Sequence, residues 1–143
     1  MRLLAALIWL LVVLAACAPK RTYVVSQVDY DELLAAAIKT VEGRGPPLKV
    51  IVLSASLPPE ARKAADRLRE VIDESDLKPA NGYDLPSGYF VLKSFSVSSH
   101  SSRITGLKGP IKSHPLDCGT RYDIPFIQED QKWHPADYTV MVC

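Results

Sequence analysis

The sequence predicts an α+β domain in which two helices pack on a mainly antiparallel C-terminal β-meander held by one disulfide bond. Three observations predict this class. Apolar residues recur at helical spacing in the first half of the chain, and strand-like segments separated by turn-rich pieces fill the second half. The chain of 143 residues is long enough for one core and too short for two.

Residues 29–43 are expected to form the first helix. Either Asp29 or Asp31 can cap its start, and Gly43 can end it. The apolar stripe that this helix turns toward a core comprises Leu33, Leu34, Ala37, Ile38 and Val41.

One strand and a second helix follow. Residues 48–55, LKVIVLSA, form a continuous apolar run rich in valine and isoleucine, which predicts a strand buried on both faces. Residues 57–75 are expected to form a helix with two prolines in its first turn, where no backbone N–H is missed. Its apolar stripe comprises Ala61, Ala64, Ala65, Leu68, Val71 and Ile72.

The second half is expected to form the meander. A loop over residues 76–88, rich in Pro, Gly, Asn and Asp, precedes it. In the third strand of the meander apolar side chains alternate with polar ones, and Pro125 indicates either an edge strand or a bulge. The expected strands are residues 89–98, 102–109, 119–127 and 138–143.

The two C-terminal cysteines constrain the last hairpin. Direct pairing of Cys118 with Cys143 centres its turn on Asp130-Gln131. Continued without change, that register turns the carboxylate of Asp137 toward the apolar face. One extra residue in the last strand moves the side chains that follow it to the opposite face of the sheet, so we expect a β-bulge within residues 133–137.

The N-terminus predicts export. Arg2 is followed by a continuously apolar segment, residues 3–16, which is too short to cross a bilayer as a helix and has the length of a signal peptide. Leu14-Ala15-Ala16-Cys17 resembles the signal of bacterial lipoproteins; the alternative is a plain secretory signal. The resemblance implies cleavage before Cys17, a diacylglyceryl group on its thiol, and a fatty acid such as palmitate on its amino group. By resemblance to Gram-negative lipoproteins, Ala18 favours the outer membrane.

This interpretation of the N-terminus divides the chain into three parts. Residues 1–16 form the signal peptide, residues 17–28 the lipidated cysteine with a short tether, and residues 29–143 a single α+β domain. Tyr23 and the two valines after it are apolar enough for part of the tether to pack on the domain.

Charge and cysteine content argue against several classes of partner and cofactor. The formal net charge of +1 falls to about zero once Arg2 is removed, so nucleic acid and electrostatic lipid binding are not expected. With Cys17 acylated, Cys118 and Cys143 form an even pair in an exported protein, which indicates a disulfide. The sequence has no C-x-x-C motif, and we expect neither a metal nor another cofactor.

Histidines are the main candidates for chemistry. His100 lies in a serine-rich turn, His114 and Asp117 could form a general-base pair, and His134 precedes a proline. Each site is better explained as a turn. No nucleophile motif accompanies His100. His114 and Asp117 lie in a segment that links two strands before the expected disulfide, and a histidine before a proline is typical of loops. Trp133 is expected to anchor the core or the hairpin, with a ligand platform as the alternative. No catalytic residue is therefore predicted.

The expected function is a non-enzymatic, protein-binding lipoprotein on the periplasmic face of the outer membrane. It would act as an inhibitor or immunity-type module, or as an accessory of an envelope assembly. The alternative is a small enzyme or ligand binder whose element order resembles the cystatin-like and NTF2-like folds, which can enclose a pocket. A deep pocket would favour the enzyme and an exposed apolar patch the binder. Tyr83, in the proline-containing loop, is a candidate interface anchor, with a core position as the alternative.

Overall fold

The computed structural model describes residues 23–43, 45–77, 88–109 and 120–142. Several sequence predictions concern residues outside these ranges: the signal peptide and most of the loop 76–88, and with them Cys17, Tyr83, His114, Asp117, Cys118 and Cys143.

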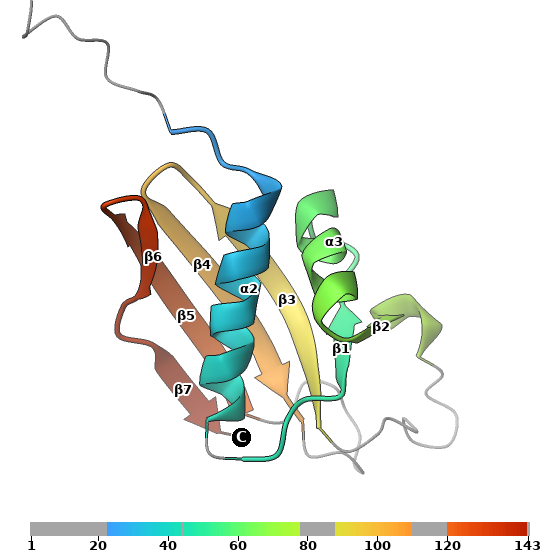
Figure 1. Ribbon diagram of the computed structural model, residues 1–143. Coiled ribbons are helices and arrows are strands. Elements are labelled where there is room, and N and C mark those ends of the chain that lie inside the picture. The colour runs from blue at the N-terminus through green and yellow to red at the C-terminus, as the bar shows by residue number, and fades with distance from the viewer. Residues whose placement is uncertain (1–22, 44, 78–87, 110–119, 143) are drawn as a thin grey trace, which may run out of the picture.

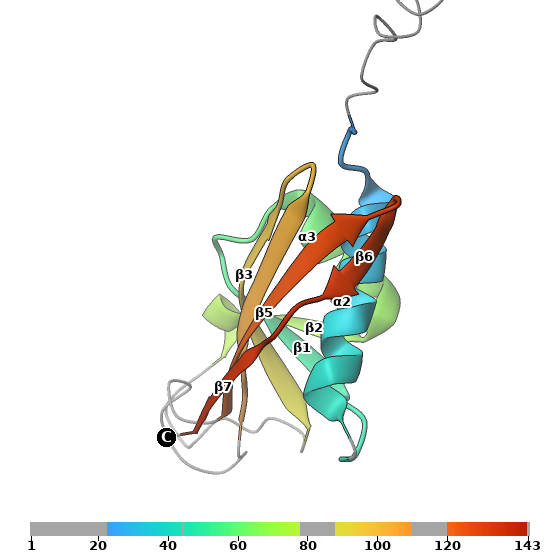
Figure 2. The same cartoon turned by 90° about the vertical axis from the view of Figure 1, so that its left-hand side faces the viewer.

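In the described part of the chain, two helices cover one face of a seven-stranded sheet (Figures 1 and 2). The strand order is β2-β1-β3-β4-β5-β6, and β7 also pairs with β5. β1 is parallel to both of its neighbours and the other pairings are antiparallel, which confirms the α+β class. The elements are α2 (Gln27–Glu42), β1 (Val50–Leu53), α3 (Pro59–Leu68), β2 (Glu70–Asp73), a 3-10 turn (Glu74–Asp76), β3 (Tyr89–Val97), β4 (Ser101–Lys108), β5 (Thr120–Glu129), β6 (Lys132–Pro135) and β7 (Thr139–Val142).

α2 begins earlier than predicted. Its N-cap is Ser26, so the prediction that Asp29 or Asp31 caps the helix is wrong. Asp29 instead occupies the third helical position, where its carboxylate accepts the backbone N–H of Ser26 at 2.7 Å and the Ser26 hydroxyl at 2.8 Å. Gly43, with φ of 54°, ends the helix as predicted.

The predicted second helix is too long. α3 ends at Leu68, Arg69 is extended with φ of −151° and ψ of 167°, and residues 70–73 form β2 beside β1. Val71 and Ile72 are β-branched, and in a strand they reach opposite faces of the sheet. Pairing with the buried β1 outweighs the helical spacing of these two residues, so the early part of the sheet contains two strands and not one.

β1 is buried on both faces, as predicted. Each of its four residues is at most 2% exposed. Ile51 and Leu53 belong to the main core beneath the helices, whereas Val50 and Val52 join a smaller cluster on the opposite face. The main core also includes α2 and α3 residues and Phe90, Leu92, Phe95, Ile104, Ile124 and Phe126 from the meander.

The last hairpin has the predicted turn and the predicted bulge. Asp130 and Gln131 both have positive φ, 50° and 63°, as a two-residue hairpin turn requires. Along β5 the pairing advances three residues, from Phe126 to Asp123, while the opposite strand advances four, from Pro135 to Thr139. The extra residue divides the last strand into β6 and β7.

Pro125 lies at this bulge and not on an edge strand. Its carbonyl accepts the N–H of Ala136 at 2.9 Å, and β5 has neighbours on both sides. Of the two alternatives for Pro125, the bulge is therefore correct. Neither helix among the described residues is both long and apolar enough to traverse a bilayer.

Candidate functional site

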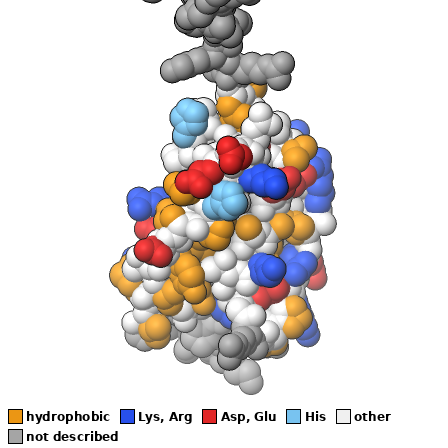
Figure 3. Space-filling view, turned by 60° about the vertical axis from the view of Figure 1, so that its left-hand side comes forward, with side chains coloured by type: hydrophobic (Ala, Val, Ile, Leu, Met, Phe, Trp, Pro, Cys, Tyr) orange, Lys and Arg blue, Asp and Glu red, His pale blue; other side chains and the backbone are white. Residues whose placement is uncertain are grey.

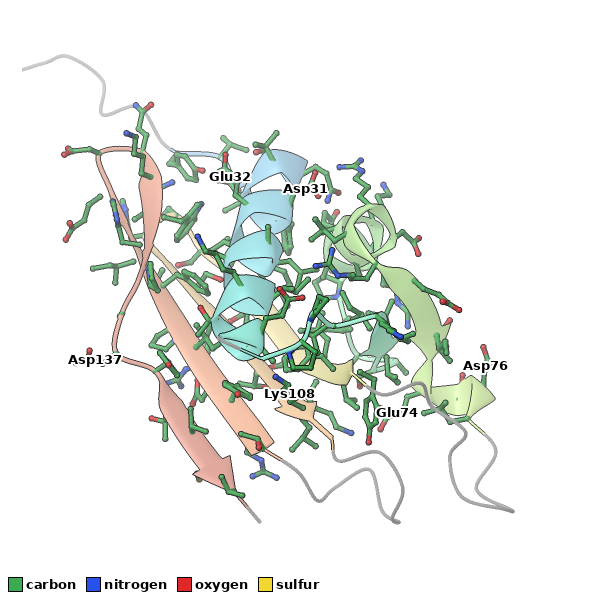
Figure 4. All side chains as sticks on the ribbon, turned by 60° about the horizontal axis from the view of Figure 1, so that its bottom comes forward. Asp31, Glu32, Glu74, Asp76, Lys108 and Asp137 are labelled. Atoms are coloured by element: carbon green, nitrogen blue, oxygen red, sulfur yellow. The ribbon has the colours of Figure 1, made fainter. Side chains whose placement is uncertain are left out.

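The described histidines lie apart and on the surface. His100 is exposed in the turn between β3 and β4, and His134 is exposed on β6; they appear as two separate patches in Figure 3. Acidic side chains such as Asp31, Glu74 and Asp137 come from distant elements (Figure 4). Within the described ranges, no three His, Cys, Asp or Glu side chains are grouped closely enough to hold a metal ion.

The depressions on the described surface include three with volumes of about 470, 420 and 400 Å³. The first lies between Thr40 of α2 and residues 135–138. The second lies at the serine-rich end of β3 and β4, and the third lies around Thr105 and Arg121 on the sheet face without helices. None of the three is lined by a histidine, so none brings a histidine together with an acid.

A buried carboxylate attaches the start of the described chain to the domain. Asp29 is 5% exposed, and it accepts hydrogen bonds from the Tyr23 hydroxyl and, at 2.9 Å, from Trp133 Nε1. Burial alone would raise the pKa of Asp29, but the hydrogen bonds from Tyr23, Trp133 and Ser26 outweigh it and lower the pKa below 3.8. Trp133 packs against the main core as predicted.

Tyr23 is the part of the expected tether that packs on the domain. The next residue, Val24, is 79% exposed and does not pack. We call the hydrogen-bonded group of Tyr23, Ser26, Asp29 and Trp133 the N-terminal clasp. It joins the chain before α2 to the β5–β6 hairpin.

An exposed apolar edge lies at the other end of this hairpin. Seven large hydrophobic side chains are exposed in the described chain, and four of them lie within residues 138–142: Tyr138 49%, Val140 43%, Met141 50% and Val142 76%. Figure 3, turned so that this edge comes forward, shows hydrophobic side chains gathered over its lower part. Contiguous apolar surface of this kind marks interaction sites more often than scattered single residues do.

β7 is exposed on both faces of the sheet. Val140 pairs with Tyr122, whose ring packs edge-on against core residue Phe90, so Val140 lies on the helix side. Met141 pairs with Arg121 and lies on the opposite side. At the level of β7 the buried core thus stops at β5, and the side chains of β7 extend beyond it.

The two edges of the sheet differ in charge. β2, at the far edge, carries the exposed Glu70 and the half-buried Asp73, and Asp73 lies 2.6 Å from Arg62 in an ion pair. On the near edge, β6 has Lys132 and Pro135, which protect against unwanted strand pairing. β7, Thr-Val-Met-Val, has no charged residue and no proline.

One cation lies beside this strand. Arg121 is exposed on the sheet face without helices and makes no ion pair within the described ranges. Two other cations are already in ion pairs: Arg103 Nε lies 3.0 Å from Asp123, and Lys93 Nζ lies 2.6 Å from Glu74.

This edge was not among the sites predicted from the sequence. The uncharged pentapeptide at residues 138–142 was a usable signal, because soluble proteins seldom leave such a strand without a gatekeeper charge. Comparison with protein-family models, curated proteins and solved structures gave no match.

Proposed function

We propose that the protein is a lipid-anchored, non-enzymatic binding module of the bacterial envelope, held at the periplasmic face of the outer membrane. The observation that carries the proposal is the exposed apolar edge of β7. An apolar patch of this kind is the feature that favours a binder over an enzyme, and no described depression offers a comparable site for chemistry.

The N-terminal clasp gives the proposed anchor a short reach. Five residues lie between Cys17 and Tyr23, and the six Cα–Cα steps from one to the other span at most about 21 Å when fully extended. The end of the domain that carries Tyr23 therefore stays close to the membrane. β7 lies toward the opposite end, beyond the bulge (Figures 1 and 2).

This orientation suits recognition of a periplasmic partner. A preordered strand loses little conformational entropy on binding, which favours association. Both proposed roles, inhibitor or immunity-type module and accessory of an envelope assembly, can use the same edge.

The experiment is site-specific photocrosslinking in intact cells of the host. A photoreactive amino acid replaces Val140 in one strain and Ile127 in another, since the two side chains are 43% and 42% exposed on neighbouring strands. We expect an adduct with another envelope protein from position 140 and none from position 127. Equal adducts from both positions, or none from position 140, would refute the proposal.

A further inference from the structure

The backbone of β5 decides which groups of β7 face outward. In an antiparallel sheet, a strand directs its backbone hydrogen bonds alternately to its two neighbours. The N–H of Gln128 donates at 3.0 Å to the carbonyl of His100, next to β4, whereas the carbonyl of Pro125 accepts from Ala136 on the other side. β5 pairs along β4 without a register shift, so its odd-numbered residues bond toward β6 and β7.

The free edge follows from this alternation. Arg121 and Asp123 are odd-numbered, and they exchange backbone hydrogen bonds with their partners Met141 and Thr139. Val140 lies between Thr139 and Met141, so its N–H and C=O point away from β5. No strand lies beyond β7 among the described elements.

We infer that the partner adds an extended segment to β7 as a further strand of the sheet, and that this segment alternates apolar with acidic side chains. The inference rests on the proposed function and specifies how the edge is used. Strand addition gains affinity from backbone hydrogen bonds and specificity from alternate side chains.

The apolar half of the pattern follows from the helix side of β7. Val140, Val142 and Tyr138 are exposed there, and the depression of about 470 Å³ between Thr40 and residues 135–138 adjoins them. Apolar side chains of an added strand would pack on this surface and extend the core past β5.

The acidic half follows from the opposite face. Arg121 lies there beside Met141 without an ion-pair partner in the described chain, and alternate residues of an added strand point to that face. A carboxylate at such a position is complementary to Arg121, and complementary charge mainly fixes register and selects partners.

A second copy of this chain does not supply the acidic half of the pattern. β7 contains no charged residue. Antiparallel pairing of two β7 strands about a two-fold axis would therefore bring no β7 carboxylate to Arg121. Parallel pairing is staggered, so identical strands cannot close a symmetric dimer.

The test uses the full, anchored chain with a photoreactive amino acid at position 141. Two variants of Val140 are compared. Val140→Pro removes the N–H that points outward but leaves every hydrogen bond to β5 in place. Val140→Thr keeps this N–H and has nearly the same side-chain shape. We expect the adduct yield to fall about tenfold for Val140→Pro and about threefold or less for Val140→Thr. The opposite order would show that the side chain alone is recognised.

The charge of Arg121 and the identity of the crosslinked protein give two further readouts. Arg121→Glu should lower the adduct yield, whereas Lys132→Glu, an exposed charge reversal on the same face near the turn, should not. An equal effect of the two reversals would contradict the acidic pattern. An adduct whose mass equals two copies of this chain would overturn the assignment to a different protein.

Hydrogen exchange covers the case in which Val140→Pro does not fold. In the purified adduct formed at position 141, the amides of Val140 and Val142 should exchange more slowly than in the free protein. Unchanged exchange in a stable adduct would overturn strand addition and leave the proposed function standing. The absence of any adduct from positions 140 and 141 would overturn both.

Discussion

Trp133 Nε1 donates a hydrogen bond of 2.9 Å to Asp29 Oδ1, joining residues 104 positions apart in the chain. The bond ties the β5–β6 hairpin to the first turn of α2, and the Tyr23 hydroxyl donates to the same carboxylate oxygen. One side chain thus fixes both the direction in which the N-terminal segment leaves the domain and the position of the hairpin.

Trp133→Phe tests the energetic weight of this bond. The substitution keeps an aromatic ring in the core and removes the donor to a buried carboxylate. We expect the free energy of unfolding to fall by about 2 kcal/mol, as for hydrogen bonds to charged groups. Urea denaturation measures the loss. Tyr30→Phe is the control, since Tyr30 packs on Phe95 at a ring distance of 4.9 Å and should change stability less.

The pH dependence of stability should carry a contribution from Asp29. Its pKa lies below 3.8 in the folded protein, so below about pH 5 the unfolded chain binds more protons than the folded one at this site. The stabilisation is present above the unfolded pKa and is lost as pH falls through the folded pKa. Urea unfolding between pH 7 and pH 3 should show a smaller decline for Asp29→Asn than for the wild type. Asp66→Asn, at an exposed site, controls for the lost charge. If stability declined with falling pH equally in Asp29→Asn and the wild type, Asp29 would not be the source of this pH dependence.

Gly106 should not tolerate a side chain. A Cβ at this position would lie 2.2 Å from the Phe90 ring and 2.6 Å from the Val91 carbonyl oxygen. Gly106→Ala should therefore destabilise the protein by about 1–3 kcal/mol through overpacking. Gly45→Ala, whose nearest contact would be 3.2 Å, is the control and should cost less. Equal melting temperatures for the two variants would count against the packing described for β3 and β4.

The Cys118–Cys143 disulfide remains a prediction, since both cysteines lie outside the described residues. Thr120, two residues after Cys118, pairs with Val142, the residue before Cys143, which is compatible with a bridge. Such a bridge should contribute about 3 kcal/mol by restricting the unfolded chain. Alkylation without reductant should label neither cysteine in protein isolated from the envelope. Rapid labelling of both would show free thiols.

Local patterns predicted the elements that depend on local chemistry. The continuous apolar run at residues 48–55 identified a strand buried on both sides. The conflict between Asp137 and the apolar face identified the bulge before β7. In both cases the alternation of side chains across a sheet allows only one arrangement.

Other features depend on contacts distant in sequence. Val71 and Ile72 have helical spacing with α3, and only their pairing with β1 makes them a strand. Asp29 was expected to cap α2, but its bonds to Tyr23 and Trp133 come from outside the helix. The uncharged pentapeptide at residues 138–142 indicates an unprotected edge strand, but the exposure of β7 on both faces depends on where α2 stops covering the sheet.

The membrane anchor at Cys17 is the claim on which both the localisation and the orientation of the domain depend. Mass spectrometry of the mature N-terminus tests it directly. We predict an N-terminal peptide that begins at an acylated Cys17, and an unprocessed precursor for Cys17→Ser. A mature protein with a free amino terminus at any other residue would show that Cys17 is not a lipid anchor.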